Sequence, residues 1–432
     1  MINKTLSSEL SVATFDVDAT PPIGSALAYN VMENGWDLGL RAKGVVLVGA
    51  GQPIVMCAVD WIGIANESQD AFRQTLADAV LTDPKRVVVH TLHQHDAPAC
   101  DLSVEKIRKE MGMPLGRYEG SFTREFLPQL GKAAKDSMNE LQPVTHISIG
   151  NAPVYKVASN RRIVKNGKVV DMRYTACTNP ALRNEPEGVI DPDVTLIAFW
   201  DEEKPVAVMT FYATHPQSYY QTRTANPDFP GLARFYRQLA MPNALHIHFN
   251  GAGGNIGAGK YNDGAHENRM ILAVRLADGM ERAWRNSTKM PITASEVSWS
   301  TEPVLLPVTD EIIRQAERSL RTPDIQSLPT TNTVWATNAR QGKTIDVACL
   351  SAGKARILFA PGELFVEYQL AAKAFRPDLA VSMAAYGEYG PSYIGTKEAY
   401  SQGGYEIDSS PVTPDAEEAL MNAFRKLLSL TV

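Results

Sequence analysis

Apolar and polar residues follow each other along the chain in two patterns. Short apolar runs bounded by glycine, proline or polar residues predict β-strands. We expect such strands at 44–48, 53–59, 86–92, 144–149, 194–200, 205–212, 245–249, 355–359 and 379–384. Apolar residues that recur at three-to-four spacing predict helices, here at 67–81, 122–139, 230–239, 268–284, 310–320, 364–374 and 415–430.

This order of elements predicts an α/β fold with a layered mixed sheet and flanking helices, because strands alternate with helices along most of the chain. The neighbouring runs 44–48 and 53–59 resemble a hairpin and argue against an all-parallel sheet. No internal repeat or low-complexity linker is visible, and the length suits one large α/β unit. We expect residues 1–432 to form a single domain.

Composition narrows the class of partner. With 44% hydrophobic and 21% charged residues the chain is an ordinary globular protein. Its net charge of −6, without a dense basic run, predicts a small-molecule substrate and no nucleic acid. The four cysteines lack CxxC spacing and are expected to be reduced core residues. Without a signal-peptide pattern or a long apolar run, we expect no integral membrane association and a cytoplasmic location, unless a leader was removed.

Polar or glycine-rich segments follow four of the expected strands. His93 follows 86–92, His215 follows 205–212, the segment 250–255 follows 245–249, and Glu363 follows 355–359. Ligands of open α/β sheets bind at the carboxyl ends of the strands. These segments are therefore predicted to meet at one site.

The run 90–98, HTLHQHDAP, holds three histidines. His93 and His95 stand at i and i+2, which on an extended chain places both side chains on one face and suits a metal site, although structural histidines are also common. His90 has odd spacing and is expected to face the core. His215 alone could be structural, and Glu363 could compensate the dipole of helix 364–374. Two histidines and a glutamate from different strand ends nevertheless form a familiar catalytic zinc set.

Two further segments carry candidate chemistry. The polar, glycine-interrupted stretch 392–406 holds three tyrosines that neither a helical face nor a strand explains. The segment 250–259 lacks the order of a nucleotide-binding loop. Its close backbone approach predicts contacts to a substrate oxyanion. We assign that role to Asn250, Gly253, Gly254 and Asn255.

Six segments in the same order resemble the neutral ceramidase family of zinc-dependent amidohydrolases, and the resemblance covers nearly the whole chain. Residues 18–24 resemble that family's D-I-T-P-P-I-G, 92–98 its T-H-T-H-S-G-P, and 160–161 its N-R-S. Residues 214–216 resemble its V-H-P, 361–363 its P-G-E, and 393–400 its Y-V-T-T-R-E-E-Y.

The resemblance implies the catalytic-domain fold of that family and a zinc ion bound by His93, His215, Glu363 and Tyr393. It also implies that His95, Arg161 and Tyr405 are catalytic groups. His95 would manage a proton, while Arg161 and Tyr405 would stabilise the oxyanion formed when water attacks an amide carbonyl.

The chain departs from the ceramidase pattern in three places. Gly257, Ala258 and Gly259 stand where that family has S-P-N, so no serine is available there. Asp96 and Ala97 replace the Ser-Gly of its histidine motif, which puts an acid beside His95 and makes Asp96 a candidate substrate or oxyanion contact that could also fix the His95 tautomer. The chain ends at Val432, without the C-terminal domain found in ceramidases.

Three other functions remain open. The same zinc site could act on a polar carbohydrate, either a glycoside or an acylated sugar, since the surrounding tyrosines suit sugar recognition. The protein could also bind a metal or ligand without turnover, through a closed four-ligand site. A metallo-β-lactamase pattern H-x-H-x-D-H is suggested by His93, His95 and Asp96, but Ala97 and Pro98 stand where its last ligands belong.

Overall fold

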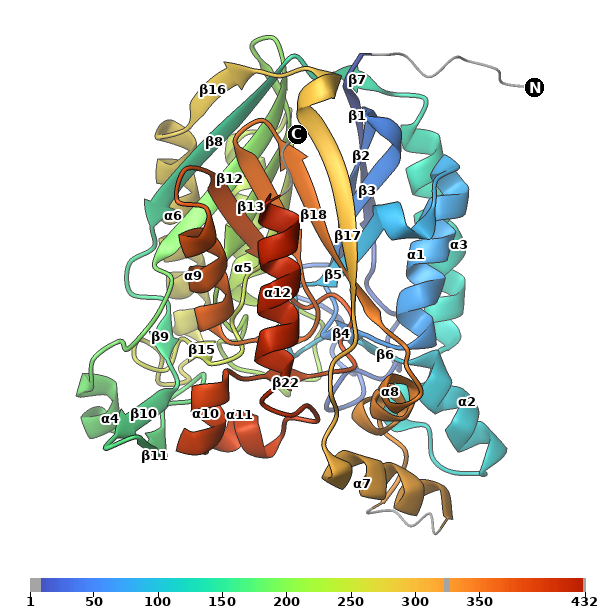
Figure 1. The fold of residues 1–432 in the computed structure, drawn as a ribbon, viewed down its shortest axis with the longest axis vertical. Helices are drawn as coiled ribbons and strands as arrows, with labels where there is room; N and C mark the ends of the chain where they lie inside the picture. Colours follow the sequence, from blue (N-terminus) through green and yellow to red (C-terminus); the bar gives the residue numbers. More distant parts are fainter. Residues whose placement is uncertain (1–8, 322–326, 430–432) are drawn as a thin grey trace.

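Three large sheets organise the computed structural model, which describes residues 9–321 and 327–429 (Figure 1). The first contains β1 (Ser11–Asp18), β2 (Arg41–Gly49), β3 (Gly51–Val59) and β5 (Val87–Thr91). The second contains β8 (His146–Pro153), β12 (Asp193–Asp201), β13 (Lys204–Tyr212) and β14 (Leu245–Asn250). The third contains β17 (Val297–Val304), β18 (Ile345–Ala352), β19 (Ala355–Phe359) and β21 (Ala380–Ala384).

The three sheets share one topology. In each, the first three strands are antiparallel neighbours and the fourth lies parallel to the third. A parallel pair needs a crossover, and each crossover here contains a helix, namely α1 (Glu67–Val80), α5 (Asp228–Ala240) or α9 (Val366–Phe375). A further helix follows each fourth strand and packs beside the crossover helix, against the first strand of the sheet: α3 (Ser121–Ser137), α6 (Glu267–Arg285) or α12 (Ala416–Ser429). The fold therefore contains a threefold structural repeat that the sequence did not reveal.

The sheets face one another across a central core, and the helix pairs cover their outer faces (Figure 1). The central cluster takes side chains from all three sheets, including Met56, Phe211, Phe249, Leu350 and Phe359. Separate clusters lie between each sheet and its helices. Because both faces are buried, central strands such as β3 are continuously apolar rather than alternating.

The predicted α/β class is confirmed, and every expected strand and helix overlaps an observed one, with ends shifted by a few residues. The predicted end at residue 430 lies outside the described residues. Helix α9 begins at Val366, because Glu363 and Leu364 instead form the short strand β20 (Glu363–Leu364). No helix in the described ranges is long and apolar enough to cross a bilayer.

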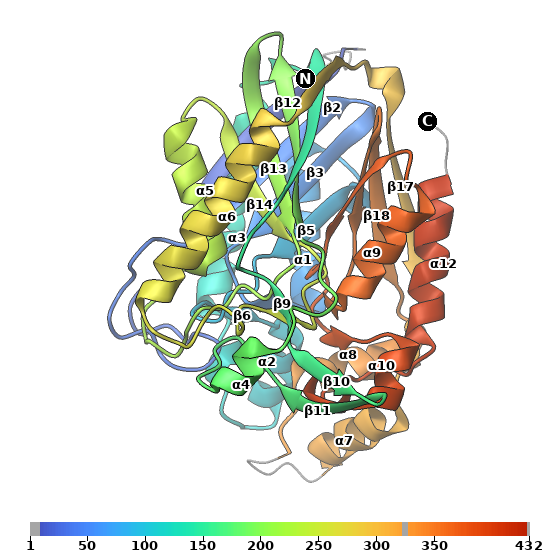
Figure 2. The same cartoon turned by 90° about the vertical axis from the view of Figure 1, so that its left-hand side faces the viewer.

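The loops that follow the third and fourth strands collect at one end of the molecule, the lower end in Figure 1. Short strand pairs join two of these loops in the first and third sheets: β4 (Gly63–Ile64) with β6 (Ala99–Cys100), and β20 with β22 (Tyr393–Ile394). In the second sheet, β15 (Ile256–Gly257) pairs instead with β9 (Ser159–Asn160), which follows the first strand, β8. These loops remain at that end after a quarter turn (Figure 2). The fold thus delivers three sets of strand ends to one region.

A buried ion pair joins the first repeat to the second. Asp60, just after β3, accepts hydrogen bonds of 2.7 and 2.6 Å from Arg234 on α5, and both side chains are nearly inaccessible. We predict that Asp60→Ala lowers the free energy of unfolding by about 3–5 kcal/mol, because it leaves a buried guanidinium without its partner. Urea denaturation measures this. The exposed pair Lys132–Asp136 on α3 is the control, and Asp136→Ala should change stability by less than about 0.5 kcal/mol.

Candidate metal and catalytic site

His93 lies in a sharp turn after β5. Its φ of 64° is in the left-handed region, which non-glycine residues rarely adopt, so the expected extended geometry of His93 and His95 is wrong. The Nδ1 atom of His93 lies 2.6 Å from the carbonyl oxygen of Ile62. A proton on Nδ1 satisfies that contact and leaves the lone pair of Nε2 facing the site.

The two other histidines of the site lie beside His93. His215 follows β13, and its Nε2 lies 3.3 Å from Nε2 of His95. Ring nitrogens of all three histidines lie within 4.8 Å of one another. Burial lowers the pKa of both His95 and His215 well below the usual 6.5, and the nearby Arg161 adds to that shift. Both imidazoles are therefore neutral at physiological pH and can offer lone pairs. His90 is buried in the core, as predicted.

Glu363 supplies the oxygen of the cluster. Its Oε1 accepts hydrogen bonds from the hydroxyls of Tyr389 (3.1 Å) and Ser392 (3.4 Å). Its Oε2 lies 3.3 Å from Nε2 of His93 and 3.8 Å from Nε2 of His215. The alternative in which Glu363 compensates a helix dipole is wrong, because the carboxylate faces the histidines and α9 starts three residues later.

This donor set fits a divalent cation. Burial would raise the pKa of the Glu363 carboxyl, but interactions with His93 and Arg161 outweigh it and hold the pKa below its usual value. The Glu363 carboxylate therefore carries a negative charge beside the two histidines, and a cation bound between them would neutralise that charge. Ligands that surround zinc tetrahedrally at about 2.1 Å lie roughly 3.4 Å apart. The separation of 3.3 Å between His93 and Glu363 is close to that spacing, and that between His215 and Glu363 is 3.8 Å.

Arg161 and Tyr393 meet beside the cluster. One NH2 group of Arg161 donates to the Tyr393 hydroxyl (3.2 Å) and to the carbonyl of Gly254 (2.8 Å), and Nε donates to Glu406 (3.1 Å). Tyr393 is also the strand partner of Glu363. The ring of Tyr405 lies edge-on to that of Tyr393, 5.7 Å between centroids. Sequence reasoning missed Glu406, since nothing in its spacing distinguishes it from other surface acids.

The glycine-rich segment plays a different part from the one expected. The N–H of Gly254 donates to the Leu364 carbonyl, and Asn255 binds the backbone N–H of Val366 and the side chain of Glu367. Asn250 donates to the Leu92 carbonyl. A Cβ added to Gly253 would meet the Thr214 backbone at 2.7 Å, and one on Gly254 the Glu363 carbonyl oxygen at 2.2 Å. The oxyanion prediction is therefore wrong for Gly254, Asn250 and Asn255, and the segment serves as close backbone packing beneath the site.

Asp96 points away from His95. Its carboxylate accepts hydrogen bonds from the backbone N–H groups of Gln221 and Thr222 and from the Thr222 hydroxyl. It is almost fully buried and is not among the residues that line the cavity over the site. The predicted contact of Asp96 with an oxyanion, or with the His95 ring, is therefore wrong.

A cavity of about 520 Å³ lies over His95, His215 and Arg161. Half-exposed Tyr29, Tyr174 and Tyr405 connect it to the surface. Six of its lining residues are tyrosines: Tyr29, Tyr174, Tyr219, Tyr220, Tyr393 and Tyr405. Sequence reasoning missed Tyr29 and Tyr174, which lie far from the motifs. His95 and His215 therefore lie at the floor of an open, hydroxyl-rich pocket.

The packing beneath Glu363 generates a prediction. Gly254→Ala should lower the free energy of unfolding by about 1–3 kcal/mol and weaken metal binding, because the new methyl group pushes on the Glu363 backbone. Thermal unfolding and metal titration measure the two effects. Gly39→Ala is the control, since its added Cβ would meet side-chain oxygens and no backbone: that of Thr20 at 3.1 Å and that of Asp18 at 4.0 Å. Equal metal affinity in the two variants would contradict the prediction.

Comparison with known proteins supports the fold. No protein-family model matches the chain, and a search of curated proteins finds no match at the sequence level. Two solved structures are similar over 97% of this chain and 74% of theirs, each with a TM-score of 0.70 and 15% sequence identity. One is described as a ceramidase complexed with C2, the other as neutral ceramidase from Pseudomonas aeruginosa. The protein therefore has the fold of neutral ceramidase.

Proposed function

We propose that the protein is a zinc-dependent hydrolase that cleaves a C–N amide bond. The observation that carries the proposal is the convergence of His93, His215 and Glu363, which follow strands of three different sheets, at a place where His215 lines an open cavity. The amide bond is inferred from the ceramidases that share the fold. Such an open site differs from a structural zinc site, which is closed by four protein ligands.

In this proposal zinc is held by His93, His215 and Glu363, with Tyr393 beside them. All four residues lie in segments held by the backbone contacts described above, so the orientation of their side chains is set before the metal binds. The ring of Tyr393 lies stacked at 6.4 Å from that of His215. Burial raises the pKa of the Tyr393 phenol well above its usual value, although Arg161 opposes that shift. Tyr393 is therefore a neutral hydroxyl donor in the metal-free protein.

The remaining residues carry the reaction. Hydrolysis joins the oxygen of water to the carbonyl carbon, breaks the C–N bond and moves a proton of water to the leaving nitrogen. Zinc, when bound, supplies a Lewis acid for this chemistry. His95 is neutral and lines the cavity, so it can accept that proton and pass it on. Arg161 and Tyr405 lie at the cavity wall, where charge develops on the carbonyl oxygen.

Glycoside cleavage is the less favoured reaction. Glycosidases generally use two carboxyl groups about 5–9 Å apart, on either side of the scissile bond. Among the described residues that line the cavity none is acidic, and Glu363 below it faces the histidines. Glu406 is completely buried and paired with Arg161 and Arg162. The described residues around the cavity therefore offer no second free carboxylate for glycoside cleavage.

We predict that His93→Ala and His95→Ala have different effects. His93→Ala should lose stoichiometric zinc, because it removes a donor whose orientation the Ile62 carbonyl sets. His95→Ala should retain zinc and lose activity by about 10²–10⁴-fold, as expected for a lost proton carrier. Metal analysis of the purified variants and amide hydrolysis assays measure both. If His95→Ala also loses its zinc, His95 is a ligand and the proton role is contradicted.

Metal removal gives a second test. Dialysis against a chelator should abolish hydrolysis of N-acyl amides, and added Zn²⁺ should restore it, while aryl glycosides should not be cleaved in either state. Release of free amine is compared with release of the aryl alcohol by the same preparation. Cleavage confined to the glycosides, or amide hydrolysis that persists without metal, would contradict the proposed function.

A further inference from the structure

The apolar surface of the cavity wall is almost entirely aromatic. Besides its six tyrosines, its lining consists of polar or ionisable side chains, and Ala176 is the one aliphatic residue among the described residues that line it. An acyl chain gains about fourfold in binding for each methylene that it buries against an apolar wall. Here it would instead cover hydroxyl groups that then lose their hydrogen bonds to water. The cavity is therefore poorly suited to a long acyl chain.

Tyr29 and Tyr220 contact His95, and together with Tyr219, which lines the same cavity, they are called the tyrosine collar. The ring of Tyr29 stacks on His95 at 5.4 Å and meets the edge of Tyr220 at 5.0 Å. Tyr220 also contacts the His95 ring edge-on, at 5.3 Å. None of the three comes from the strands that carry the metal donors. The shape of the cavity above His95 therefore depends on how two loops, 19–40 and 213–227, are held.

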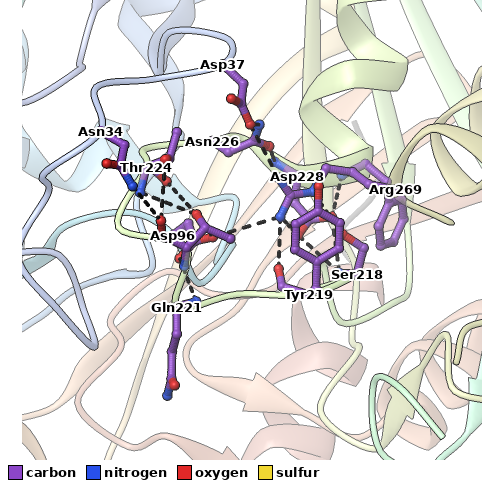
Figure 3. A network of polar contacts seen from close by, with 12 residues as sticks. Asn34, Asp37, Asp96, Ser218, Tyr219, Gln221, Thr224, Asn226, Asp228 and Arg269 are labelled. Carbon is purple, nitrogen blue, oxygen red and sulfur yellow. Dashed lines mark hydrogen bonds and ion pairs between the residues drawn. The ribbon is translucent and has the colours of Figure 1, made fainter. Parts of the chain in front are cut away.

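Asp96 holds the second of these loops (Figure 3). Its Oδ1 accepts a hydrogen bond from the Gln221 N–H at 2.8 Å, and its Oδ2 accepts one from the Thr222 hydroxyl at 2.8 Å. Its backbone carbonyl accepts another from the N–H of Asn226. A carboxylate is needed to accept at two separate oxygens. The serine of the ceramidase motif, at the same position, offers only one.

Arg269 on α6 holds the base of the collar. Its Nε donates to the Ser218 hydroxyl and its NH2 group to the Tyr219 carbonyl, both at 2.9 Å. Its guanidinium also lies 3.7 Å from the centre of the Tyr219 ring and 3.5–3.8 Å from the carboxylates of Asp37, Asp96 and Asp228 (Figure 3). This network, buried except for the exposed Asp37 of the first loop, links both loops to one arginine. Loop 19–40 is bound to loop 213–227 through the Arg223 carbonyl, which accepts hydrogen bonds from the N–H groups of Glu33 and Asn34.

We propose that the collar restricts the site to compact, polar N-acyl amides, with a short acyl group on a hydroxylated amine such as an amino sugar, and that Asp96 is the positioning residue for this selectivity. The proposal rests on the proposed amide hydrolysis. Phenol hydroxyls can donate to and accept from substrate hydroxyls, and aromatic rings cover the flat face of a sugar. The acid next to His95 thus acts on specificity through the loop, not on the proton of His95.

The full-length, zinc-loaded protein tests the substrate class. We expect kcat/KM to fall by at least about tenfold from N-acetylglucosamine to N-octanoylglucosamine, and N-acetylsphingosine to exceed N-palmitoylsphingosine. A kcat/KM that rises with acyl length overturns the inference while leaving the amide hydrolase intact. If no amide is hydrolysed, the proposed function fails, and calorimetry of the two glucosamines still decides the pocket's preference: tighter binding of the octanoyl compound overturns it.

Substitution of Asp96 tests the positioning role. We expect Asp96→Ser to keep its zinc, to raise KM for N-acetylglucosamine more than it lowers kcat, and to raise the octanoyl-to-acetyl ratio of kcat/KM about tenfold. Asp96→Asn has the same shape, and its octanoyl-to-acetyl ratio should lie between those of Asp96→Ser and the unmodified protein.

Glu33→Ala is the control, because its exposed ion pair with Arg223 lies on the same loops without contacting the cavity. If Asp96→Ser does not fold, Thr222→Val, which removes one of the Asp96 contacts, should shift the ratio in the same direction. An unchanged ratio in the folded variants overturns the role of Asp96.

Discussion

The site depends on one electrostatic constraint, the meeting of a buried carboxylate oxygen of Glu363 with the ring nitrogens of His93 and His215. Lone pairs would face one another at 3.3 and 3.8 Å across a medium of low dielectric constant. Such an arrangement is stable only if a proton or a cation lies between them. The backbone contact that sets the His93 ring and the hydroxyls that bind the other Glu363 oxygen both favour this convergence.

The threefold repeat explains how the donors come so close. Each sheet ends its third and fourth strands at the same end of the molecule, and each contributes a polar loop there. The glycines at 253 and 254 allow the loop after β14 to pass directly beneath Thr214 and Glu363. Arg161, which forms an ion pair with the buried Glu406, lies on the remaining side of the cluster formed by Glu363 and the histidines. Rigid strands set the coarse positions, and backbone hydrogen bonds set the orientations.

The loops above the donors are held by side-chain contacts rather than by strands. Tyr29 and Tyr220 contact His95, and Asp96 and Arg269 bind the irregular loop that carries Tyr219 and Tyr220. In a pocket of this kind, the metal cluster limits which chemistry is possible, while the loops limit which molecules can reach it. The proposed role of Asp96 follows from this division, because its carboxylate contacts a loop of the collar and not the histidine cluster.

The sequence by itself determined the elements, because apolar periodicity directly reflects which faces are buried. It also identified His93, His215 and Glu363 as polar residues at strand ends, and the ordered motifs that resemble neutral ceramidases predicted the fold. Only the tertiary structure decided the left-handed turn at His93, the partners of Asp96, the packing role of Gly254 and the presence of Tyr29 over the site. These features depend on contacts between residues far apart in the chain, such as Asp96 with Thr222 and Gly254 with Leu364, and local patterns carry no record of such contacts.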